Sequence, residues 1–458
     1  MDASSSEKPQ SVYSQAERAV VPSSTSSAKE KADLDTPVID SSSPVADDDV
    51  PADPFDSYPE GGRGWIVVLG CVIFSASTVG WALAWGIVQT YYVEHLFPHT
   101  SESVLSTLGS MSGMIMTLTS VITGKLGDRY GYKPFLAAGA LCWTVSMLCS
   151  AFCTKVWQFF LTQGVLQGIA CSLVFPLIVA LPAQWFYKYR ALTTGIVVAG
   201  SSLGGAVASM LMYGMLESLG LRRTFAIYSA IDAVSMTAAF FMIQERRRPQ
   251  SKRPDIIWFD RTFFMDPVFW SLGLCFLFTT FGYLSPIFYL PTYTSEKIPS
   301  ASLLLSSLPV TALNLSAAAG RTLIGFVADR TGPVNALFVA IFMSGITQIL
   351  IWNFVTTYAG IMIFAILYGF FCGCFISLTP AVGAQLYGSG RLAGLSGLLL
   401  FFNLPGNSAG APLGGAILSA TNGSWRAVAS WSGAMQIAGA MILLYARFKR
   451  QPKLFSVY

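Results

Sequence analysis

The chain has 458 residues, of which 53% are hydrophobic and only 11% are charged, against roughly 25% charged in an ordinary soluble domain. So few charges cannot cover the surface of a water-soluble protein of this length. The formal net charge is only +4, and the basic residues form short clusters rather than one broad face, which argues against a nucleic-acid-binding protein.

The first 63 residues differ in composition from the rest of the chain. They are rich in Ser, Asp and Pro, with runs such as Asp47-Asp48-Asp49, and they contain almost no aromatic residues. Such a segment buries too little apolar area to offset its conformational entropy. It also lacks the apolar core of a secretory signal peptide. We expect residues 1–63 to be a disordered cytoplasmic tail.

From Trp65 onward the sequence contains apolar runs of roughly 20 residues, the length that crosses about 30 Å of hydrocarbon. These runs predict an all-α membrane protein with twelve transmembrane helices. The expected spans are 65–92, 104–122, 134–153, 157–181, 191–216, 224–243, 266–290, 303–325, 334–352, 358–382, 393–418 and 427–445.

The longest inner loop divides the twelve spans evenly. The sequence therefore predicts two six-helix halves, over residues 64–243 and 265–446, joined by a cytoplasmic linker over 244–264. A short cytoplasmic tail over 447–458 follows the second half.

The expected orientation follows from the Lys and Arg residues of the loops, because basic side chains are retained on the cytoplasmic side during insertion. With both termini inside, the inner loops carry most of these residues, including the run Arg246-Arg247-Arg248. The outer loops then carry only Lys155, Arg222, Arg223, Lys297 and Arg426. This imbalance favours cytoplasmic termini, and it makes Asn422, in the sequon Asn422-Gly423-Ser424, an external glycosylation site.

The loop after the second span carries a run of glycines and charges. It reads Gly124-Lys125-Leu126-Gly127-Asp128-Arg129-Tyr130-Gly131-Tyr132-Lys133. The glycines permit a tight turn between packed helix ends. Asp128 can accept hydrogen bonds from helix N-terminal amides and from Arg129. We therefore expect a charge network at the inner ends of the helices.

Few polar side chains lie deep inside the predicted spans. Gln167 in span four and Asn403 in span eleven suit an interhelix hydrogen bond as well as a ligand contact. Asp232 in span six and Arg321 in span eight are charged, and a charge deep in hydrocarbon costs about 2.5–3.5 kcal/mol on the insertion scale. Each charge therefore suggests a cavity or a partner.

Arg321 is the stronger candidate of the two. Its guanidinium stays protonated and offers a planar fork of donors that suits a carboxylate. The alternative is that Arg321 extends to the inner surface or braces Asp329.

Span seven is rich in aromatic residues and helix breakers. Tyr283 and Tyr289 could line a cavity, although packing and interfacial anchoring explain them equally well. Gly282, Pro286 and Pro291 predict a break in this helix, so that its outer half could flex.

The two halves contain an internal repeat. Gly325-Phe326-Val327-Ala328-Asp329-Arg330-Thr331-Gly332 follows span eight. It shares Gly-x-x-x-Asp-Arg-x-Gly with the loop after span two, at an offset of 201 residues. The same offset relates Ala183-Gln184 to Ala384-Gln385. The matches in register indicate an ancestral duplication.

The loop after span two resembles the signature loop of the major facilitator superfamily. The resemblance implies the major facilitator fold and transport by alternating access. The resemblance implies that the residues of this loop gate the substrate path. The alternative is that the loop is purely structural and only helps to set the topology. The residues of this expected gate are Gly124, Asp128, Arg129, Gly131, Lys133, Gly325, Asp329, Arg330 and Gly332.

Three further stretches resemble the monocarboxylate-porter family, and its fungal members most. They are Glu60-Gly61-Gly62-Arg63-Gly64-Trp65, then Gly200-Ser201-Ser202-Leu203-Gly204-Gly205, and Asn314-x-Ser316 leading to Gly320-Arg321. The resemblance implies that Arg321 engages a substrate carboxylate. Leu83 and Ala317 stand where proton-coupled members carry a lysine and an acid, so proton coupling is not implied.

These observations predict a transporter of a small organic solute, most simply a monocarboxylate or a related organic acid. The expected substrate-binding residues are Arg321, Asn314, Tyr283, Tyr289, Gln167 and Asn403. Asp232 is expected to pair with a polar neighbour, with a coupling role as the alternative. An exporter of a secondary metabolite, a carrier of a neutral solute and a non-transporting nutrient sensor are the other readings.

No enzymatic activity is expected, because no nucleophile and base cluster in the sequence. No cofactor and no metal are expected either, since His95 and His99 are the only histidines and the cysteines fall in apolar stretches. The expected partners are the lipid bilayer and a small-molecule substrate, without nucleic acid. We expect a monomer, by resemblance in the plasma membrane.

Overall fold

The computed structural model describes residues 58–100, 102–246, 261–299, 303–388 and 392–450. The regular elements of this described part are all helices, which confirms the expected all-α class. In hydrocarbon each backbone N–H and C=O needs a partner within its own segment, and a helix supplies it.

The helices of residues 58–246 form a first group, which we call the first half. They are α1 (Arg63–Tyr91), η1 (Tyr92–Leu96), α2 (Glu102–Tyr130), α3 (Lys133–Ser150), α4 (Val156–Phe159), η2 (Phe160–Leu166), α5 (Gln167–Ala180), η3 (Leu181–Gln184) and α6 (Arg190–Met242).

The helices of residues 261–450 form a second group, which we call the second half. They are α7 (Arg261–Met265), α8 (Pro267–Lys297), α9 (Leu303–Thr331), α10 (Pro333–Thr347), η4 (Gln348–Trp352), α11 (Tyr358–Cys372), α12 (Cys374–Tyr387), α13 (Leu392–Phe401), α14 (Leu404–Ala420) and α15 (Trp425–Arg450).

Ten helical stretches of the described chain are long and apolar enough to cross a membrane. The expected spans 104–122 and 393–418 are not among the ten. The first lies within α2, and the second is divided between α13 and α14. The expected span was continuous, but Pro405 lies in the first turn of α14. Its missing N–H cannot bond to the preceding turn, and the helix is interrupted there.

The helix α6 covers the expected spans five and six. Its course changes at Gly220, whose φ of 72° lies in the left-handed region that glycine adopts at little cost. The two expected spans are therefore present, and they are joined by a turn of a single residue.

The break predicted in span seven is wrong. The helix α8 runs without interruption through Pro286 and Pro291. The Tyr368 hydroxyl donates to the Tyr283 carbonyl oxygen at 2.9 Å, in the turn before Pro286. This bond joins α11 to the turn of α8 that precedes Pro286.

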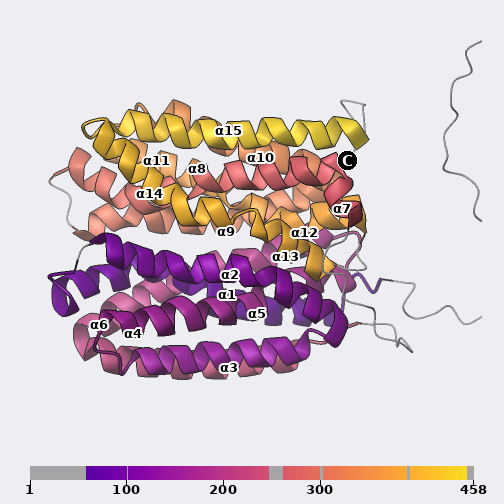
Figure 1. The fold of residues 1–458 in the computed structure, drawn as a ribbon, viewed down its shortest axis with the longest axis horizontal. Helices are drawn as coiled ribbons and strands as arrows, with labels where there is room; N and C mark the ends of the chain where they lie inside the picture. Colours follow the sequence, from indigo (N-terminus) through magenta and orange to yellow (C-terminus); the bar gives the residue numbers. More distant parts are fainter. Residues whose placement is uncertain (1–57, 101, 247–260, 300–302, 389–391, 451–458) are drawn as a thin grey trace, which may run out of the picture. The chain divides into compact units, whose positions relative to one another are not determined.

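Each half buries its own apolar core, the first between Val67 and Ile243 and the second between Val268 and Ala446. The few exceptions are residues such as Ala393 and Ala191, which join the core of the opposite half. Both halves belong to one compact unit, residues 53–458, in which the helices run alongside one another (Figure 1).

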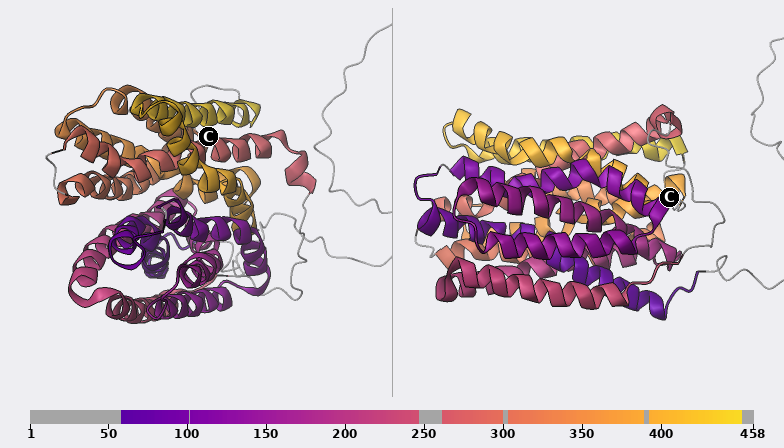
Figure 2. Two further views of the ribbon diagram at one scale, coloured as in Figure 1. Left: turned by 60° about the vertical axis from the view of Figure 1, so that its left-hand side comes forward. Right: turned by 60° about the horizontal axis from the view of Figure 1, so that its bottom comes forward.

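Two further views show the long helices of both halves side by side (Figure 2). At one end of this bundle, side chains of acidic residues tie helix ends together. Glu60 Oε1 accepts from the N–H groups of Tyr187 and Lys188 at 2.6 and 2.7 Å. Glu245 Oε1 accepts from the N–H groups of Tyr132 and Lys133 at 2.7 and 2.6 Å. Both copies of the Gly-x-x-x-Asp-Arg-x-Gly repeat lie at this end, which we call the repeat end.

The tail expected over 1–63 and the linker expected over 244–264 lie largely outside the described residues. So does most of the tail expected over 447–458. The helix α15 continues to Arg450, four residues past the expected end of the second half.

Candidate functional site

Two helix crossings join the halves at the repeat end. The helix α6 packs against α9, and α2 packs against α13. We call them the α6–α9 crossing and the α2–α13 crossing. The repeat relates them, because α9 lies in the second half where α2 lies in the first.

Glycine lets the helices of both crossings approach closely. A Cβ atom on Gly325 would lie 2.6 Å from the Ala191 carbonyl oxygen. A Cβ atom on Gly124 would collide with the Ala393 carbonyl oxygen in the same way. Because no real Cβ tolerates such contacts, a larger residue at either position would push the halves apart.

A second pair of glycines repeats this contact about one turn further from the repeat end. A Cβ atom on Gly195 would collide with the carbonyl oxygen of Arg321. A Cβ atom on Gly397 would lie 2.5 Å from the carbonyl oxygen of Ser120. Arg321 and Ser120 are 201 residues apart, so they occupy equivalent positions in the two crossings.

An aspartate of the repeat binds across each crossing. Asp329 Oδ1 accepts from the Ala191 N–H and Oδ2 from the Leu192 N–H, both at 2.8 Å. These amides belong to the first turn of α6, where N–H groups lack helical partners and the helix dipole favours an anion. Asp329 therefore holds the start of α6 from the opposite half.

Asp128 makes the equivalent contact in the other crossing. Its Oδ2 accepts from the Gly394 N–H at 2.7 Å, in the first turn of α13. Its Oδ1 accepts from the Tyr132 hydroxyl at 3.0 Å. The acceptance from a helix N-terminal amide that the sequence predicts for Asp128 is thus present in the structure.

The arginines of the two copies lie over aromatic rings of their own helices. The Arg129 guanidinium is 5.4 Å from the Tyr130 ring centre. The Arg330 guanidinium is 4.2 Å from the Phe326 ring centre. Both contacts are cation–π interactions.

The remaining residues of the expected gate shape the turns after α2 and α9. Gly131 and Gly332 have φ values of 103° and 95°, which side-chain-bearing residues rarely adopt. The Lys133 ammonium lies 5.7 Å from the Phe240 ring centre. These residues belong to the repeat end but make no described bond across the crossings.

Arg321 is buried inside the α6–α9 crossing, with 3% of its surface exposed. Its Nη1 donates to the Val198 carbonyl at 3.1 Å and to the hydroxyls of Ser201 and Ser202 at 3.0 and 2.8 Å. Its Nε has no partner, and no carboxylate of the described chain pairs with it. The alternative that Arg321 extends to the surface or braces Asp329 is therefore wrong.

Tyr283 is the expected site residue that the fold brings to Arg321. Its hydroxyl lies beside the guanidinium, and its ring packs edge-on against Phe375 at 5.3 Å between centres. Asn314 lies on α9, seven residues before Arg321, and is buried. Its side chain has no hydrogen bond within the described ranges.

Two other expected binding residues bind neighbouring helices of the second half. The Tyr289 hydroxyl donates to the Ala411 carbonyl oxygen at 2.7 Å. Asn403 Oδ1 accepts from the Thr280 hydroxyl at 2.8 Å. Both contacts join α8 to the α13–α14 region, and neither includes Arg321.

The polar residues of the first half also bind neighbouring helices. Gln167 Nε2 lies 2.9 Å from the Met147 sulfur of α3. Asp232 is buried and accepts from Trp143 Nε1, also of α3, at 2.8 Å. Asp232 therefore has the polar neighbour that the sequence analysis expects.

Ser120, Ser201 and Ser202 were not identified as functional candidates from the sequence. Serine is common in membrane helices, so its presence alone carries little information. The repeat offset was the usable signal, because it gives Ser120 the position in the first half that Arg321 has in the second. Nothing in the sequence pattern indicates that Ser201 and Ser202 face Arg321. Among the described residues, no group of three His, Cys, Asp or Glu side chains could hold a metal ion.

Comparisons with known proteins give a consistent family assignment. The family model of the Major Facilitator Superfamily matches residues 66–340. The MFS-type transporter pynF of Aspergillus niger is 29% identical over 395 residues, covering 85% of this chain and 90% of the relative.

Two further relatives are named as efflux proteins. The Aspyridones efflux protein apdF of Emericella nidulans is 32% identical over 396 residues, covering 86% of this chain and 79% of the relative. The Agnestins efflux protein AgnL12 of Paecilomyces divaricatus is 30% identical, covering 84% and 88%. The solved structure of the human organic anion transporter MFSD10 superposes with a TM-score of 0.67 at 17% identity, over 84% of this chain and 100% of that one, a likeness of fold.

Proposed function

This chain belongs to the Major Facilitator Superfamily, and on that premise we propose that it exports a small organic molecule with an acidic group by alternating access, with Arg321 binding the acid. One observation carries the proposal: Arg321 is a buried cation with no carboxylate partner in the described chain.

A buried cation without an anion is unfavourable, because hydroxyl and carbonyl dipoles replace lost hydration only in part. Helix packing does not require this cation. The equivalent position of the α2–α13 crossing holds Ser120, which donates to the Gly397 carbonyl at 3.3 Å. The extra charge of Arg321 is therefore explained best by an anionic ligand, with Tyr283 beside the guanidinium and Asn314 about two turns away on α9.

The direction of transport is supported by the relatives, two of which are named as efflux proteins. The second candidate is uptake of a monocarboxylate, which the same arginine and the resemblance to monocarboxylate porters favour. Both candidates use one site, and they differ in the direction of flux.

The two crossings supply a mechanism for the conformational change. Asp128 and Asp329 hold the first turns of helices in the opposite half, and the glycines at 124 and 325 allow the close approach. In the described conformation the two halves are in contact at the repeat end. Opening that end breaks both aspartate contacts, so we assign these residues to the gate.

We further propose that the repeat end faces the cytoplasm of the cell, with the plasma membrane as the location. The basic residues of the expected inner loops support this orientation. Asn422 lies in an exposed turn at the opposite end. If that turn is external, glycosidase treatment will lower the apparent mass of the wild type and leave Asn422→Gln unchanged. An unglycosylated wild type, with a sequon placed in the expected inner linker modified instead, contradicts the orientation.

Asp232 is our candidate for coupling, although it lies at the α3–α6 contact of the first half. At an offset of 204 residues, the second half holds Gln436, which accepts from Ser344 and Gln348 at 2.6 and 2.8 Å. The first half thus keeps an ionisable group where the second half has an amide.

The proposal is tested by flux measurements in yeast that express the chain. Cells are offered, or preloaded with, pairs of carboxylic acids and their primary amides, which match in size and differ in charge. Wild-type protein should transport an acid faster than its amide, and outward flux should exceed inward flux. Arg321→Ala at equal surface expression should remove the preference for the acid.

The outcomes separate the candidates. Faster inward flux of acids would favour monocarboxylate uptake. Equal flux of acids and amides in the wild type would contradict an acid site and favour a neutral cargo. An unchanged preference in Arg321→Ala would remove Arg321 from the site, and no flux of any member would favour the sensor.

A further inference from the structure

A groove outside the crossings opens on the surface of the second half, between the start of α8 and the end of α15. Its volume is about 490 Å³. Met265, Trp270 and Leu274 line one side, and Ile442 and Tyr445 line the other. These residues lie within about two turns of the helix ends at the repeat end, which places the groove just inside the membrane surface.

The groove is largely apolar, and the polar groups of Ser271 and Trp270 in its lining are already bonded. The Ser271 hydroxyl donates to the Ile442 carbonyl oxygen at 2.7 Å and thereby ties α8 to α15. Trp270 Nε1 donates to the Phe264 carbonyl oxygen at 2.8 Å. Met265 and Tyr445 are 80% and 49% exposed. The groove therefore offers apolar surface to the hydrocarbon around it.

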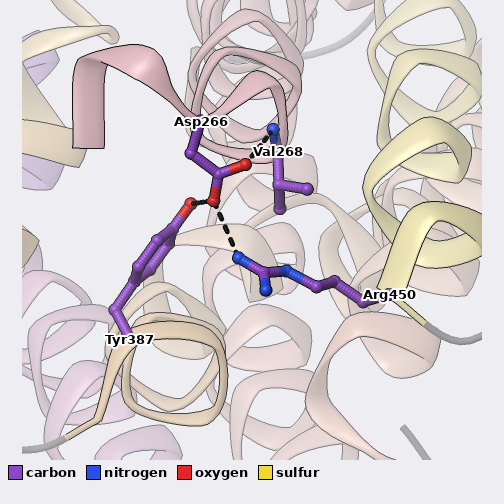
Figure 3. Close-up of polar contacts among 4 residues, drawn as sticks. All are labelled: Asp266, Val268, Tyr387 and Arg450. Atoms are coloured by element: carbon purple, nitrogen blue, oxygen red, sulfur yellow. Dashed lines mark hydrogen bonds and ion pairs between the residues drawn. The ribbon is translucent and has the colours of Figure 1, made fainter. Parts of the chain in front are cut away.

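Cations lie at the surface end of this groove. Arg450 Nη2 forms an ion pair with Asp266 Oδ2 at 2.8 Å (Figure 3). Asp266 is the residue between two lining residues, and it also accepts from the Tyr387 hydroxyl and the Val268 N–H at 2.9 and 3.0 Å. Both oxygens of its carboxylate are therefore bonded. Lys449 lies next to Arg450 on the last turn of α15.

The charges at this end do not cancel. Arg450 keeps 44% of its side-chain surface exposed and bonds only through Nη2 among the described residues. Lys449 is exposed as well. Among the described residues at this end of the groove, the exposed cations Lys449 and Arg450 thus outnumber the single carboxylate of Asp266, both of whose oxygens are already bonded.

We propose that the groove is a binding site for an anionic phospholipid, with an acyl chain between α8 and α15 and the phosphate at Arg450 and Lys449. Apolar surface alone would accept any lipid, whereas the adjacent cations select a negative headgroup. A soluble anion would leave the groove unoccupied. A phospholipid would fill the groove with its acyl chain and neutralise the cations with its phosphate. It would thereby bridge helices α8, α12 and α15 around Asp266.

The test uses the full-length protein purified in detergent, so that it depends neither on transport nor on orientation. Phosphatidylserine and phosphatidylcholine with identical acyl chains are added, and bound lipid is counted by native mass spectrometry. Lys449→Gln removes one cation and leaves the Arg450–Asp266 pair intact. Leu274→Trp fills the groove without changing its charge.

Matched controls come from the first half. Lys188→Gln removes an exposed cation at the same end of the bundle. Val234→Trp enlarges a residue that is 72% exposed on the membrane-facing surface. Neither control residue touches the groove.

We expect the wild type to prefer phosphatidylserine. Lys449→Gln should weaken that binding roughly 5-fold, the contribution of about one surface cation. Leu274→Trp should remove the bound lipid, and both controls should bind as the wild type does. Equal binding of the two lipids, or full binding by Leu274→Trp, would overturn the proposal. Competition by inorganic phosphate alone would also overturn it, because the site would then recognise the anion without the chain.

Discussion

The α6–α9 crossing and the α2–α13 crossing share one construction but differ at the position that Arg321 and Ser120 occupy. Each has two glycines that face carbonyl oxygens of the opposite half, and each has an aspartate that binds a helix N-terminus across the contact. At the equivalent position of the repeat, one crossing holds Arg321 and the other Ser120.

The glycines and the aspartates, which both crossings have, serve the contact between the halves. Small residues let the helices approach closely, and the aspartate carboxylates accept from unpaired amides at helix N-termini. The difference separates packing from ligand binding. The Ser120 hydroxyl lies within hydrogen-bond distance of the Thr117 and Gly397 carbonyl oxygens, at 2.9 and 3.3 Å, and carries no charge, whereas Arg321 keeps an unpartnered Nε and an unneutralised charge. The following substitutions test this division.

The largest effect is expected at the position where the crossings differ. Arg321→Ala should lower the transport of acids about 100-fold, because a lost partner for a buried anion costs about 3 kcal/mol. Ser120→Ala should change it less than about 3-fold, the value of one neutral hydrogen bond. Flux assays at equal surface expression measure both. Equal losses in the two variants would show that the crossings have the same role.

The next effect concerns the glycines that the crossings share. Gly325→Ala and Gly124→Ala should each favour the conformation open at the repeat end about 30-fold, since overpacking costs about 1–3 kcal/mol. Hydrogen–deuterium exchange of the first turns of α6 and α13 should rise accordingly. Gly113→Ala on α2 is the control, because a Cβ there meets no atom within 4 Å. Unchanged exchange in both variants would remove the crossings from the gate.

Replacing the two aspartates should have a moderate effect on amide exchange, and the effect should be larger for Asp329 than for Asp128. Asp329→Asn removes the charge from two amide contacts, and Asp128→Asn removes it from one amide contact and one hydroxyl contact. We expect amide exchange at Ala191 and Leu192 to rise about 10-fold, and at Gly394 about 5-fold, from the loss of charged hydrogen bonds. The reverse order would mean that the α2–α13 crossing is the stronger lock.

The smallest effect concerns the hydroxyls that hold Arg321. Ser201→Ala and Ser202→Ala each remove one hydroxyl to which Arg321 Nη1 donates. Because that hydroxyl competes with a bound acid, the affinity for the acid should increase about 3-fold, the value of one hydrogen bond. Binding is measured by isothermal titration with the acid that the flux panel identifies. Ser229→Ala is the control, since its hydroxyl binds the Thr144 carbonyl at 3.0 Å. Weaker acid binding would make the two serines part of the ligand site itself.

Several features of the fold were predictable because they depend on local sequence. The helical spans follow from runs of apolar residues, and the repeat follows from matched glycines and charges. The contact of Asp128 with a helix N-terminus was predictable because a carboxylate at a helix end has few other suitable partners. The helix to which it binds, α13 of the opposite half, was not.

The wrong prediction and the undecided ones have a common cause. Pro286 and Pro291 were expected to break α8, whereas α8 runs through both without interruption. Tyr289, Asn403 and Gln167 each bind a neighbouring helix, which is the alternative that the sequence left open, and their contact with a ligand stays a prediction. A membrane helix is apolar on its lipid face and on its packed face alike, so its pattern does not reveal which side meets which neighbour.

The amino-acid sequence by itself therefore determined the class of protein, the number of apolar runs, the duplication and the residue types at the crossings. Tertiary structure alone decided that Ser201 and Ser202 of the first half hold Arg321 of the second. It also decided that the Asp266–Arg450 pair adjoins an apolar groove. The reason is physical: local properties depend on composition and period, but contacts between distant segments depend on how each helix is rotated and where it is placed in the bundle.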